Sequence, residues 1–257
     1  MSENPVILER EGPTAYLTLN RPRRRNALTL EMLKGIKKCL GKIAADKDIS
    51  VVVIRSEGPV FSSGHDLKEL QEADTAGLEE IFRSCTAMME YIQEMPQPAI
   101  ARVQGLATAA GLQLVAACDL AVAAETAGFA APGVRIGFFC STPMVPLSRA
   151  VGRKKALEML LTGETISAAE ALRHGLVNRV VPPENLDGTV RELTGILAGF
   201  SRSVLDGGKR AFYQQLELSQ EEAYRMASCA MIQGAGRHEA VEGISAFLEK
   251  RKPRWED

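Results

Sequence analysis

The chain has 257 residues, of which 46% are hydrophobic and 25% charged, and its formal net charge is −1. This composition is typical of a globular protein with one large domain. The near-neutral charge argues against nucleic acid or an anionic membrane as a partner. The five cysteines are irregularly spaced and form no CxxC pair, so we expect no metal site and a reducing compartment.

The first five residues contain no basic segment followed by an apolar one, so we expect no signal peptide. No apolar run is long enough to span a membrane. We therefore expect a cytoplasmic protein. A matured organelle protein is the alternative that the sequence leaves open.

Strands and helices alternate in the first half of the chain. We expect strands at residues 15–19, 51–55, 99–104 and 120–123, and helices at 26–38, from about 66, at 76–95 and at 109–117. Thr29 is a plausible N-cap within the first of these helical stretches, with Glu31 behind it. This alternation predicts an α/β core with parallel strands.

The second half becomes helical. We expect helices at 154–161, 168–174 and 187–200, three more as far as residue 251, and a single strand at 176–181. Helices with surplus apolar surface often build subunit contacts. We therefore divide the chain into a core at 1–186 and a helical oligomerisation region at 187–257.

Two short stretches of small residues, 61–68 and 105–113, each follow an expected strand and precede an expected helix. Small residues let a ligand approach the backbone N–H groups at a helix start, and two such turns could direct two donors at one oxygen. Close packing of helix against strand would favour the same residues. Asp66 and Glu69 have the spacing of a capping box. The side chain of His65 is either a hydrogen-bonded structural group or a catalytic one.

Blocks of residues along most of the chain resemble the crotonase superfamily, the enoyl-CoA hydratase/isomerase family. The matching blocks lie at residues 19–22, 26–28, 61–67, 103–107, 118–123, 161–164, 168–171 and 175–177. The resemblance implies the ClpP/crotonase fold: an α/β spiral of stacked β–β–α turns in two near-perpendicular sheets, with a helical C-terminal region that trimerises. It also implies an acyl-CoA thioester as ligand, with no separate cofactor, and a homotrimer or a dimer of trimers.

The resemblance further implies site residues. The backbone N–H groups of His65 and Ala110 would form an oxyanion hole. Coenzyme A would lie along a set of seven residues, with the last of them often supplied by a neighbouring subunit: Arg25, Ala27, His65, Asp66, Leu67, Lys68 and Lys250.

The resemblance places the acyl pocket among four residues: Phe138, Phe139, Cys140 and Met144. Cys140 would be a nucleophile if a base such as His65 lowered its pKa. Since cysteine is among the most buried residue types, an inert thiol is the other interpretation.

Two positions depart from the pattern of the family. Gln113 and Gly133 stand where a typical hydratase of this family has the two glutamates that activate water and move the α-proton. Glutamine cannot act as a base and glycine has no side chain. We also expect Gly133 to hold a backbone angle that other residues resist. Ordinary hydration should therefore be strongly suppressed.

Two hypotheses follow. The first is an enzyme that stabilises an enolate through the oxyanion hole, in decarboxylation, thioester hydrolysis or slow isomerisation. The second is a non-catalytic acyl-CoA-binding protein that has kept the pocket and lost both acids.

Overall fold

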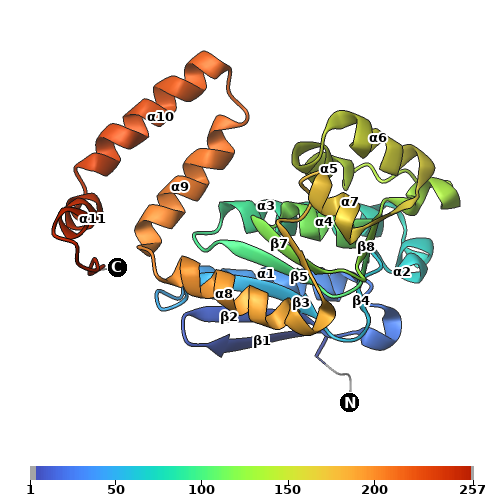
Figure 1. Ribbon diagram of the computed structural model, residues 1–257. Helices are drawn as coiled ribbons and strands as arrows, with labels where there is room; N and C mark the ends of the chain where they lie inside the picture. Colours follow the sequence, from blue (N-terminus) through green and yellow to red (C-terminus); the bar gives the residue numbers. More distant parts are fainter. Residues whose placement is uncertain (1–3, 256–257) are drawn as a thin grey trace.

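The computed structural model describes residues 4–255 and forms an α/β core with two sheets and a projecting helical arm (Figure 1). One sheet has the order β1-β2-β3-β5-β7-β10, and the other the order β4-β6-β8-β9. Pairing is parallel except between β1 and β2 and between β8 and β9. The strands are β1 (Val6–Glu11), β2 (Thr14–Leu19), β3 (Val51–Ser56), β4 (Val60–Ser62), β5 (Ala99–Val103), β6 (Leu106–Thr108), β7 (Leu120–Ala124), β8 (Gly128–Ala130), β9 (Thr165–Ser167) and β10 (Arg179–Val181).

Helices cover the two sheets and build the arm. They are α1 (Leu30–Ala45), α2 (Leu67–Glu72), α3 (Thr75–Glu94), α4 (Ala110–Ala117), α5 (Met144–Ala150), α6 (Arg153–Thr162), α7 (Ala168–Arg173), α8 (Leu186–Ala198), α9 (Arg202–Gln215), α10 (Gln220–Ala235) and α11 (His238–Leu248), with short 3₁₀ turns η1 (Pro22–Arg24), η2 (Pro132–Ile136) and η3 (Pro183–Asn185). Within residues 4–255, no helix is both long and apolar enough to cross a membrane.

The helix expected at 26–38 is α1, which begins later, at Leu30, and ends later, at Ala45. Thr29 is its N-cap, as expected, and accepts a hydrogen bond from the Met32 N–H at 3.3 Å. Arg25 and Asn26 are not helical, because both have positive φ angles, 52° and 49°. The buried Asn26 side chain accepts from the Arg21 N–H and donates to two further backbone carbonyls, each at 2.8 Å. These bonds fix a turn where the sequence pattern predicted the start of a helix.

Most of the elements that the sequence did not predict are short. The strands β4, β6, β8 and β9 have three residues each, which is too few to show a period of two. β1 and α5 were also missed, and the strand expected at 176–181 begins only at Arg179. The four short strands form the second sheet, so sequence periodicity alone predicted only the strands of the first sheet.

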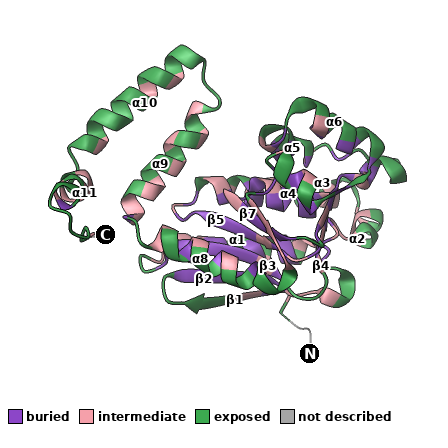
Figure 2. Ribbon diagram, in the orientation of Figure 1, coloured by how far each residue is buried: buried purple, intermediate pink, exposed green. Residues whose placement is uncertain are grey.

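The arm begins after α8. Leu186 and Val190 of α8 pack with Tyr16 and Val53 on the large sheet, so this helix lies against the core. The predicted division between residues 186 and 187 therefore falls at the start of α8. Helices α9, α10 and α11 extend away from the sheets (Figure 1) and are largely exposed (Figure 2).

A half-buried carboxylate holds α9 against the core. Asp119, just before β7, forms an ion pair with Lys209 at 2.7 Å and accepts a hydrogen bond from the Tyr213 hydroxyl at 2.8 Å. Lys209 also donates to the carbonyls of Ile92 and Gln97. Its side chain is only 7% exposed, so these bonds replace most of the hydration of its ammonium group.

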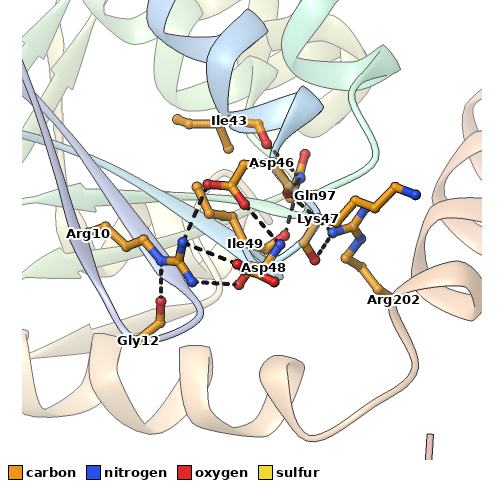
Figure 3. Close-up of polar contacts among 9 residues, drawn as sticks. All are labelled: Arg10, Gly12, Ile43, Asp46, Lys47, Asp48, Ile49, Gln97 and Arg202. Atoms are coloured by element: carbon orange, nitrogen blue, oxygen red, sulfur yellow. Dashed lines mark hydrogen bonds and ion pairs between the residues drawn. The ribbon is translucent and has the colours of Figure 1, made fainter. Parts of the chain in front are cut away.

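A second attachment joins the start of α9 to the loop between α1 and β3 (Figure 3). Arg202 donates to the carbonyls of Asp46 and Lys47. The buried amide of Gln97 donates to the Ile43 carbonyl near the end of α1 and to the Ile49 carbonyl of this loop, at 2.9 and 3.2 Å. The arm is therefore held at two places on the core.

Replacing Lys209 by methionine should lower the free energy of unfolding by about 3 kcal/mol, because the largely shielded carboxylate of Asp119 would lose its cation. Urea unfolding at one fixed protein concentration measures this. Lys37→Met on the exposed face of α1 is the control, since Lys37 has no ion-pair partner within residues 4–255. A loss smaller than about 1 kcal/mol would show that other contacts hold the arm.

Candidate functional site

The first turn follows β4 and is held by the segment that precedes α1. The Ser63 N–H donates to the Arg25 carbonyl at 3.0 Å, and the buried Ser62 hydroxyl donates to the Asn26 carbonyl at 2.9 Å. The conformation fixed by the Asn26 side chain therefore also positions the first turn.

Leu28 then sets the direction of the His65 backbone. The Leu28 N–H donates to the Gly64 carbonyl at 2.8 Å, and its carbonyl accepts from the Asp66 N–H at 3.4 Å. The groups on either side of His65 thus face Leu28, as in a parallel bridge. The Gly64 carbonyl and the His65 N–H belong to one trans peptide group and point in opposite directions. Because the carbonyl faces Leu28, the N–H of His65 points away from Leu28.

The second turn ends in a strained residue. Ala109, the N-cap of α4, has φ 49° and ψ −118°, and its N–H donates to the Ala130 carbonyl at 3.0 Å. An alanine in this region costs of order 1–3 kcal/mol and persists only where the surroundings impose it. The next residue, Ala110, begins α4, so its N–H lies outside the hydrogen bonding of the helix.

The two turns are in direct contact. A Cβ placed on Gly64 would lie 2.8 Å from the Cβ of Ala109 and 3.2 Å from the backbone nitrogen of Ala110. A Cβ on Gly111 would overlap the carbonyl oxygen of Ser62. Only glycine allows this approach, and Gly64 also has a φ of 88° that disfavours other residues.

The structure therefore brings together the backbone N–H groups of His65 and Ala110. Neither of them has a hydrogen-bond acceptor within residues 4–255. The N-terminus of α4 adds positive electrostatic potential to this place. The pair can donate two hydrogen bonds to one oxygen atom that enters between the turns.

The expected capping box is only half correct. Asp66 caps α2, because its side chain accepts from the Lys68 N–H at 3.2 Å. Glu69 does not bond back to Asp66. Its carboxylate instead accepts from the N–H of Leu30, at 3.0 and 3.2 Å, and so caps α1. The sequence spacing could not reveal this, because the partner lies 39 positions away.

Of the seven expected coenzyme A residues, His65 lies in the first turn, five others surround it, and the seventh lies elsewhere. Arg21 joins two of the five, since it donates to the Ala27 carbonyl at 2.9 Å and pairs with Asp66 at 3.5 Å. Lys250 follows α11, at the far end of the arm from α2 (Figure 1). The residues at the turn are Arg25, Ala27, Asp66, Leu67 and Lys68, of which Arg25, Leu67 and Lys68 are exposed.

His65 is half-buried, with its ring turned into the protein. Both ring nitrogens are shielded from solvent, and neither has a partner in the part of the chain that the structure describes. The Leu28 backbone still acts on the ring, so the choice between a hydrogen-bonded structural histidine and a catalytic one stays a prediction. Burial lowers the pKa of His65, and the Leu28 carbonyl opposes this shift, so the ring is neutral at pH 7.

Phe82 of α3 links His65 to the expected acyl pocket. The ring of His65 meets Phe82 edge-on, with centroids 5.3 Å apart, and Phe82 lies 6.0 Å from Phe138. Sequence analysis missed Phe82. It follows Ile81 of the buried stripe of α3, and an aromatic residue just beside such a stripe is the signal that could have identified it.

The other expected pocket residues lie in and after the loop that follows η2. Phe138, Phe139 and Met144 are 49%, 38% and 40% exposed, whereas Cys140 is buried. Burial raises the pKa of the Cys140 thiol, against the opposing effect of the Gly133 backbone. A raised pKa means little thiolate at pH 7, so the geometry gives no support to a nucleophilic Cys140.

Gln113 lies one turn along α4 from Ala110. Its side chain is 3% exposed, and its Oε1 atom has no hydrogen-bond partner among residues 4–255. An uncharged amide at this place can hold a polar group but cannot take a proton as a base would.

Gly133 is enclosed by the loop that follows it. A Cβ here would overlap the carbonyl oxygen of Phe138 and lie 2.9 Å from the Cys140 sulfur. The Phe138 N–H also donates to the Gly133 carbonyl at 2.9 Å. The expectation of a special backbone angle is wrong, since Gly133 is not among the positive-φ glycines. The obstacle to a side chain here is the neighbouring backbone.

A cavity on the protein lies away from these residues. It has a volume of about 930 Å³ and lies between the ends of α3 and α4 on one side and α9 on the other. Its walls include Asp119 and Tyr213, which anchor the arm. In the described part of the chain, no group of three or more His, Cys, Asp or Glu side chains is arranged to hold a metal ion.

Comparison with known proteins defines the family. The family model for enoyl-CoA hydratase/isomerase matches residues 9–257, and the chain therefore belongs to this family. The crystal structure of an enoyl-CoA hydratase from Mycobacterium smegmatis superposes with a TM-score of 0.96 at 46% identity, covering 99% of this chain and 100% of that one. The α/β crotonase fold predicted from the sequence is confirmed.

A group of vertebrate proteins is also similar over most of the chain. Enoyl-CoA hydratase domain-containing protein 3, mitochondrial, from mouse is 51% identical over 240 residues, which is 93% of this chain and 80% of the mouse protein. The crystal structure of the human protein of that name superposes with a TM-score of 0.95 at 48% identity, covering 98% and 100% of the two chains. The mouse, rat and human relatives are all named mitochondrial. The prediction of a cytoplasmic protein is therefore wrong.

Gly133→Ala should lower the free energy of unfolding by about 1–3 kcal/mol, because the added methyl group forces the Phe138 carbonyl to move. The control is Gly188→Ala in α8, where a Cβ meets no described atom within 4 Å. That substitution should stabilise the helix by about 0.5–1 kcal/mol. Denaturant unfolding of the three proteins measures both effects. Equal stability of Gly133→Ala and the parent would mean that the loop yields freely.

Proposed function

We propose that the protein binds acyl thioesters of coenzyme A and holds the thioester oxygen between the N–H groups of His65 and Ala110. One observation carries the proposal: two N–H groups that lack acceptors within residues 4–255 come from turns in direct contact. Membership of the enoyl-CoA hydratase/isomerase family supports the choice of ligand. Two convergent donors would stabilise the negative charge that an enolate places on this oxygen.

The reaction would be one that needs enolate stabilisation without the paired carboxylates of a hydratase. Gln113 cannot act as a base, and a side chain at position 133 would overlap the Phe138 backbone. General acid–base catalysis typically contributes about 10²–10⁴-fold. Decarboxylation, thioester hydrolysis and slow isomerisation are the reactions left to a site with an oxyanion hole alone.

The strain at Ala109 favours catalysis over simple binding. Its unusual φ and ψ set the direction of the Ala110 N–H. Holding coenzyme A by its nucleotide and pantetheine parts would not require this direction. A strained residue that directs a donor at the thioester oxygen is typical of a site that acts on the transition state.

The charged end of coenzyme A would lie beside the exposed Arg25 and Lys68 at the first turn. Charge-assisted contacts to its phosphates should weaken as the salt concentration rises. Lys250 stands on the arm, so it would reach the same ligand only from a neighbouring copy of the chain.

Comparing a thioester with a thioether tests the oxyanion hole separately from binding of the nucleotide. Butyryl-CoA should bind at least about fivefold more tightly than S-butyl-CoA, because only the thioester has a carbonyl oxygen. Calorimetry measures both dissociation constants. Gly64→Ala should remove the preference, since its new Cβ presses on Ala109 and the Ala110 nitrogen.

Gly12→Ala is the matched control. Gly12 also has a positive φ, 56°, but a Cβ there meets no described atom within 4 Å. This variant should keep the preference for the thioester. Failure of the parent protein to bind either compound would overturn the proposed ligand, and equal binding of the two would overturn the oxyanion hole.

Incubation with two substrates in deuterated water distinguishes the reactions. We expect very little hydration of crotonyl-CoA, followed by its absorbance. We also expect slow incorporation of deuterium at the α-carbon of butyryl-CoA, followed by mass spectrometry, because the α-proton can pass to solvent hydroxide while the oxyanion hole stabilises the enolate. Brisk hydration would show that other residues replace both acids. Absence of both reactions would favour the non-catalytic acyl-CoA-binding protein.

We further propose that the arm joins copies of the chain in a homotrimer or a dimer of trimers. Its outer helices expose large apolar side chains: Met231 by 75%, Ile232 by 74%, Phe247 by 82% and Leu248 by 73%. Such surface is normally covered by a partner. The family resemblance implies a trimer or a dimer of trimers, so we expect the number of copies to be a multiple of three.

Sedimentation at micromolar concentration should therefore give a multiple of three times the mass of the chain. Phe247→Glu should shift the distribution towards smaller species, since it places a charge in the apolar surface of the arm. Leu161→Glu, at a position 62% exposed on α6, should leave it unchanged. A stable monomer of the parent protein would contradict the proposal.

A further inference from the structure

The direction of the His65 N–H depends on what holds the chain on both sides of this residue. On the N-terminal side, the Gly64 carbonyl accepts a hydrogen bond from the Leu28 N–H at 2.8 Å. On the C-terminal side, the Asp66 N–H donates to the Leu28 carbonyl at 3.4 Å, which is beyond the usual range for such a bond. The backbone of Leu28 therefore holds the side that leads into α2 less firmly.

The helix α2 gives this side little support from the core. It has six residues, and none of them is buried. Of its two leucines, Leu67 is 58% exposed, and Leu70 packs only partly buried against the core. A helix this short is marginal in water without tertiary contacts. Polar contacts must therefore supply much of the attachment of α2.

Glu69 makes the best-formed of these polar contacts. The Leu30 N–H donates to both oxygens of its carboxylate, at 3.0 and 3.2 Å, whereas the ion pair between Asp66 and Arg21 has a separation of 3.5 Å. Leu30 is the first residue of α1, so its N–H has no partner within that helix. A charged acceptor strengthens a hydrogen bond, and a negative charge is favourable at a helix N-terminus.

The contact joins two segments that already meet at the first turn. Leu28 and Leu30 are two positions apart, and their partners Gly64 and Glu69 lie on either side of His65. The helix α1 also has a cap of its own, because Thr29 accepts a hydrogen bond from the Met32 N–H at 3.3 Å. The particular effect of Glu69 is therefore to fix α2, and the backbone that enters it, against the start of α1.

We propose that Glu69 is a positioning residue of the oxyanion hole. Its bond to the Leu30 N–H holds α2 where the His65 N–H is directed at the thioester oxygen. An oxyanion hole works only when its donors are aligned with the oxygen, and a misplacement of about 1 Å can cost about 10²-fold in rate. This inference rests on the proposed function, because it takes that oxygen to lie between the N–H groups of His65 and Ala110.

Substitutions at position 69 separate the hydrogen bond from the size of the side chain. Glu69→Met keeps a similar size and removes the acceptor, and Glu69→Gln keeps one acceptor oxygen. The preference for butyryl-CoA over S-butyl-CoA, measured by calorimetry, should fall from at least about fivefold in the parent to below about twofold in Glu69→Met. Glu69→Gln should keep most of the preference. Because each comparison uses one protein and two ligands, a change in nucleotide binding cancels.

Two control variants separate positioning from surface charge and from capping of α1. Glu72→Met lies one turn further along α2 and removes an exposed ion pair with Lys68, whose separation is 3.7 Å. Thr29→Val removes the N-cap of α1 and leaves the contact between Glu69 and Leu30. Thr29→Val should lower the midpoint of urea unfolding. Both variants should keep the preference of the parent.

Infrared spectroscopy of bound butyryl-CoA, labelled with ¹³C at the thioester carbonyl, gives a second readout. Hydrogen bonds to a carbonyl oxygen lower its stretching frequency. With all of the ligand bound, the lowering should be smaller in Glu69→Met than in the parent, and Glu72→Met should match the parent. A loss of stability alone would not change this frequency in the folded protein.

A preference and a carbonyl shift that both survive in Glu69→Met would overturn the proposal and leave acyl-CoA binding intact. Equal losses in Glu69→Met and Thr29→Val would also overturn it, since the effect would then come from the stability of α1. If Glu69→Met does not fold, Glu69→Asp replaces it, because it keeps the charge and withdraws the oxygens by one methylene group. An unchanged preference in Glu69→Asp would count against the proposal in the same way. Absence of any preference in the parent would instead overturn the oxyanion hole of the proposed function.

Discussion

Contact between two stretches of backbone, with no room for a side chain between them, is the constraint on which the site depends. The carbonyl of Ser62 lies where a Cβ of Gly111 would stand, and the Ala110 nitrogen lies 3.2 Å from where a Cβ of Gly64 would stand. Similar contact occurs nearby, where a Cβ on Gly105 would overlap the Pro59 carbonyl. A turn after one strand of the small sheet is thereby held against the start of the helix that follows the next strand.

The hydrogen-bonding pattern of this region follows from the same contact. Leu28 binds the groups that flank His65 on one side, and the second turn occupies the other. The His65 N–H is left between the two layers of backbone. The direction of the His65 N–H is thus set by main-chain geometry and does not depend on the side chain of His65. This position can therefore carry a side chain as large as histidine.

The sequence predicted those features of the fold that repeat along the chain. The buried strand β3 was recognised from its continuous run of β-branched residues, and α3 from the length of its helical pattern. The strands of the small sheet have only three residues each and show no such recurrence. They are specified by neighbours distant in sequence, and these become apparent only in three dimensions.

The site could be predicted in part for the same reason. Runs of small residues marked both turns, and family resemblance supplied the roles expected for His65 and Ala110. The capping of α1 by Glu69, the aromatic contact with Phe82 and the enclosure of Gly133 all depend on partners brought together by folding. Position 133 shows the difference most clearly: its glycine suggested an unusual backbone angle, but the structure shows a steric limit.

The carboxylate of Asp119 connects the arm to the interior in a way that bears on how the chain could be shortened. Besides Lys209 and Tyr213 on α9, it accepts a hydrogen bond from the Ala99 N–H at the start of β5, at 2.6 Å. A chain ending after α8 would keep this acid just before β7, an inner strand of the large sheet, and lose both of its partners on the arm. The core is therefore not an autonomous module to which the arm was added, and a minimal core would need a neutral residue at position 119.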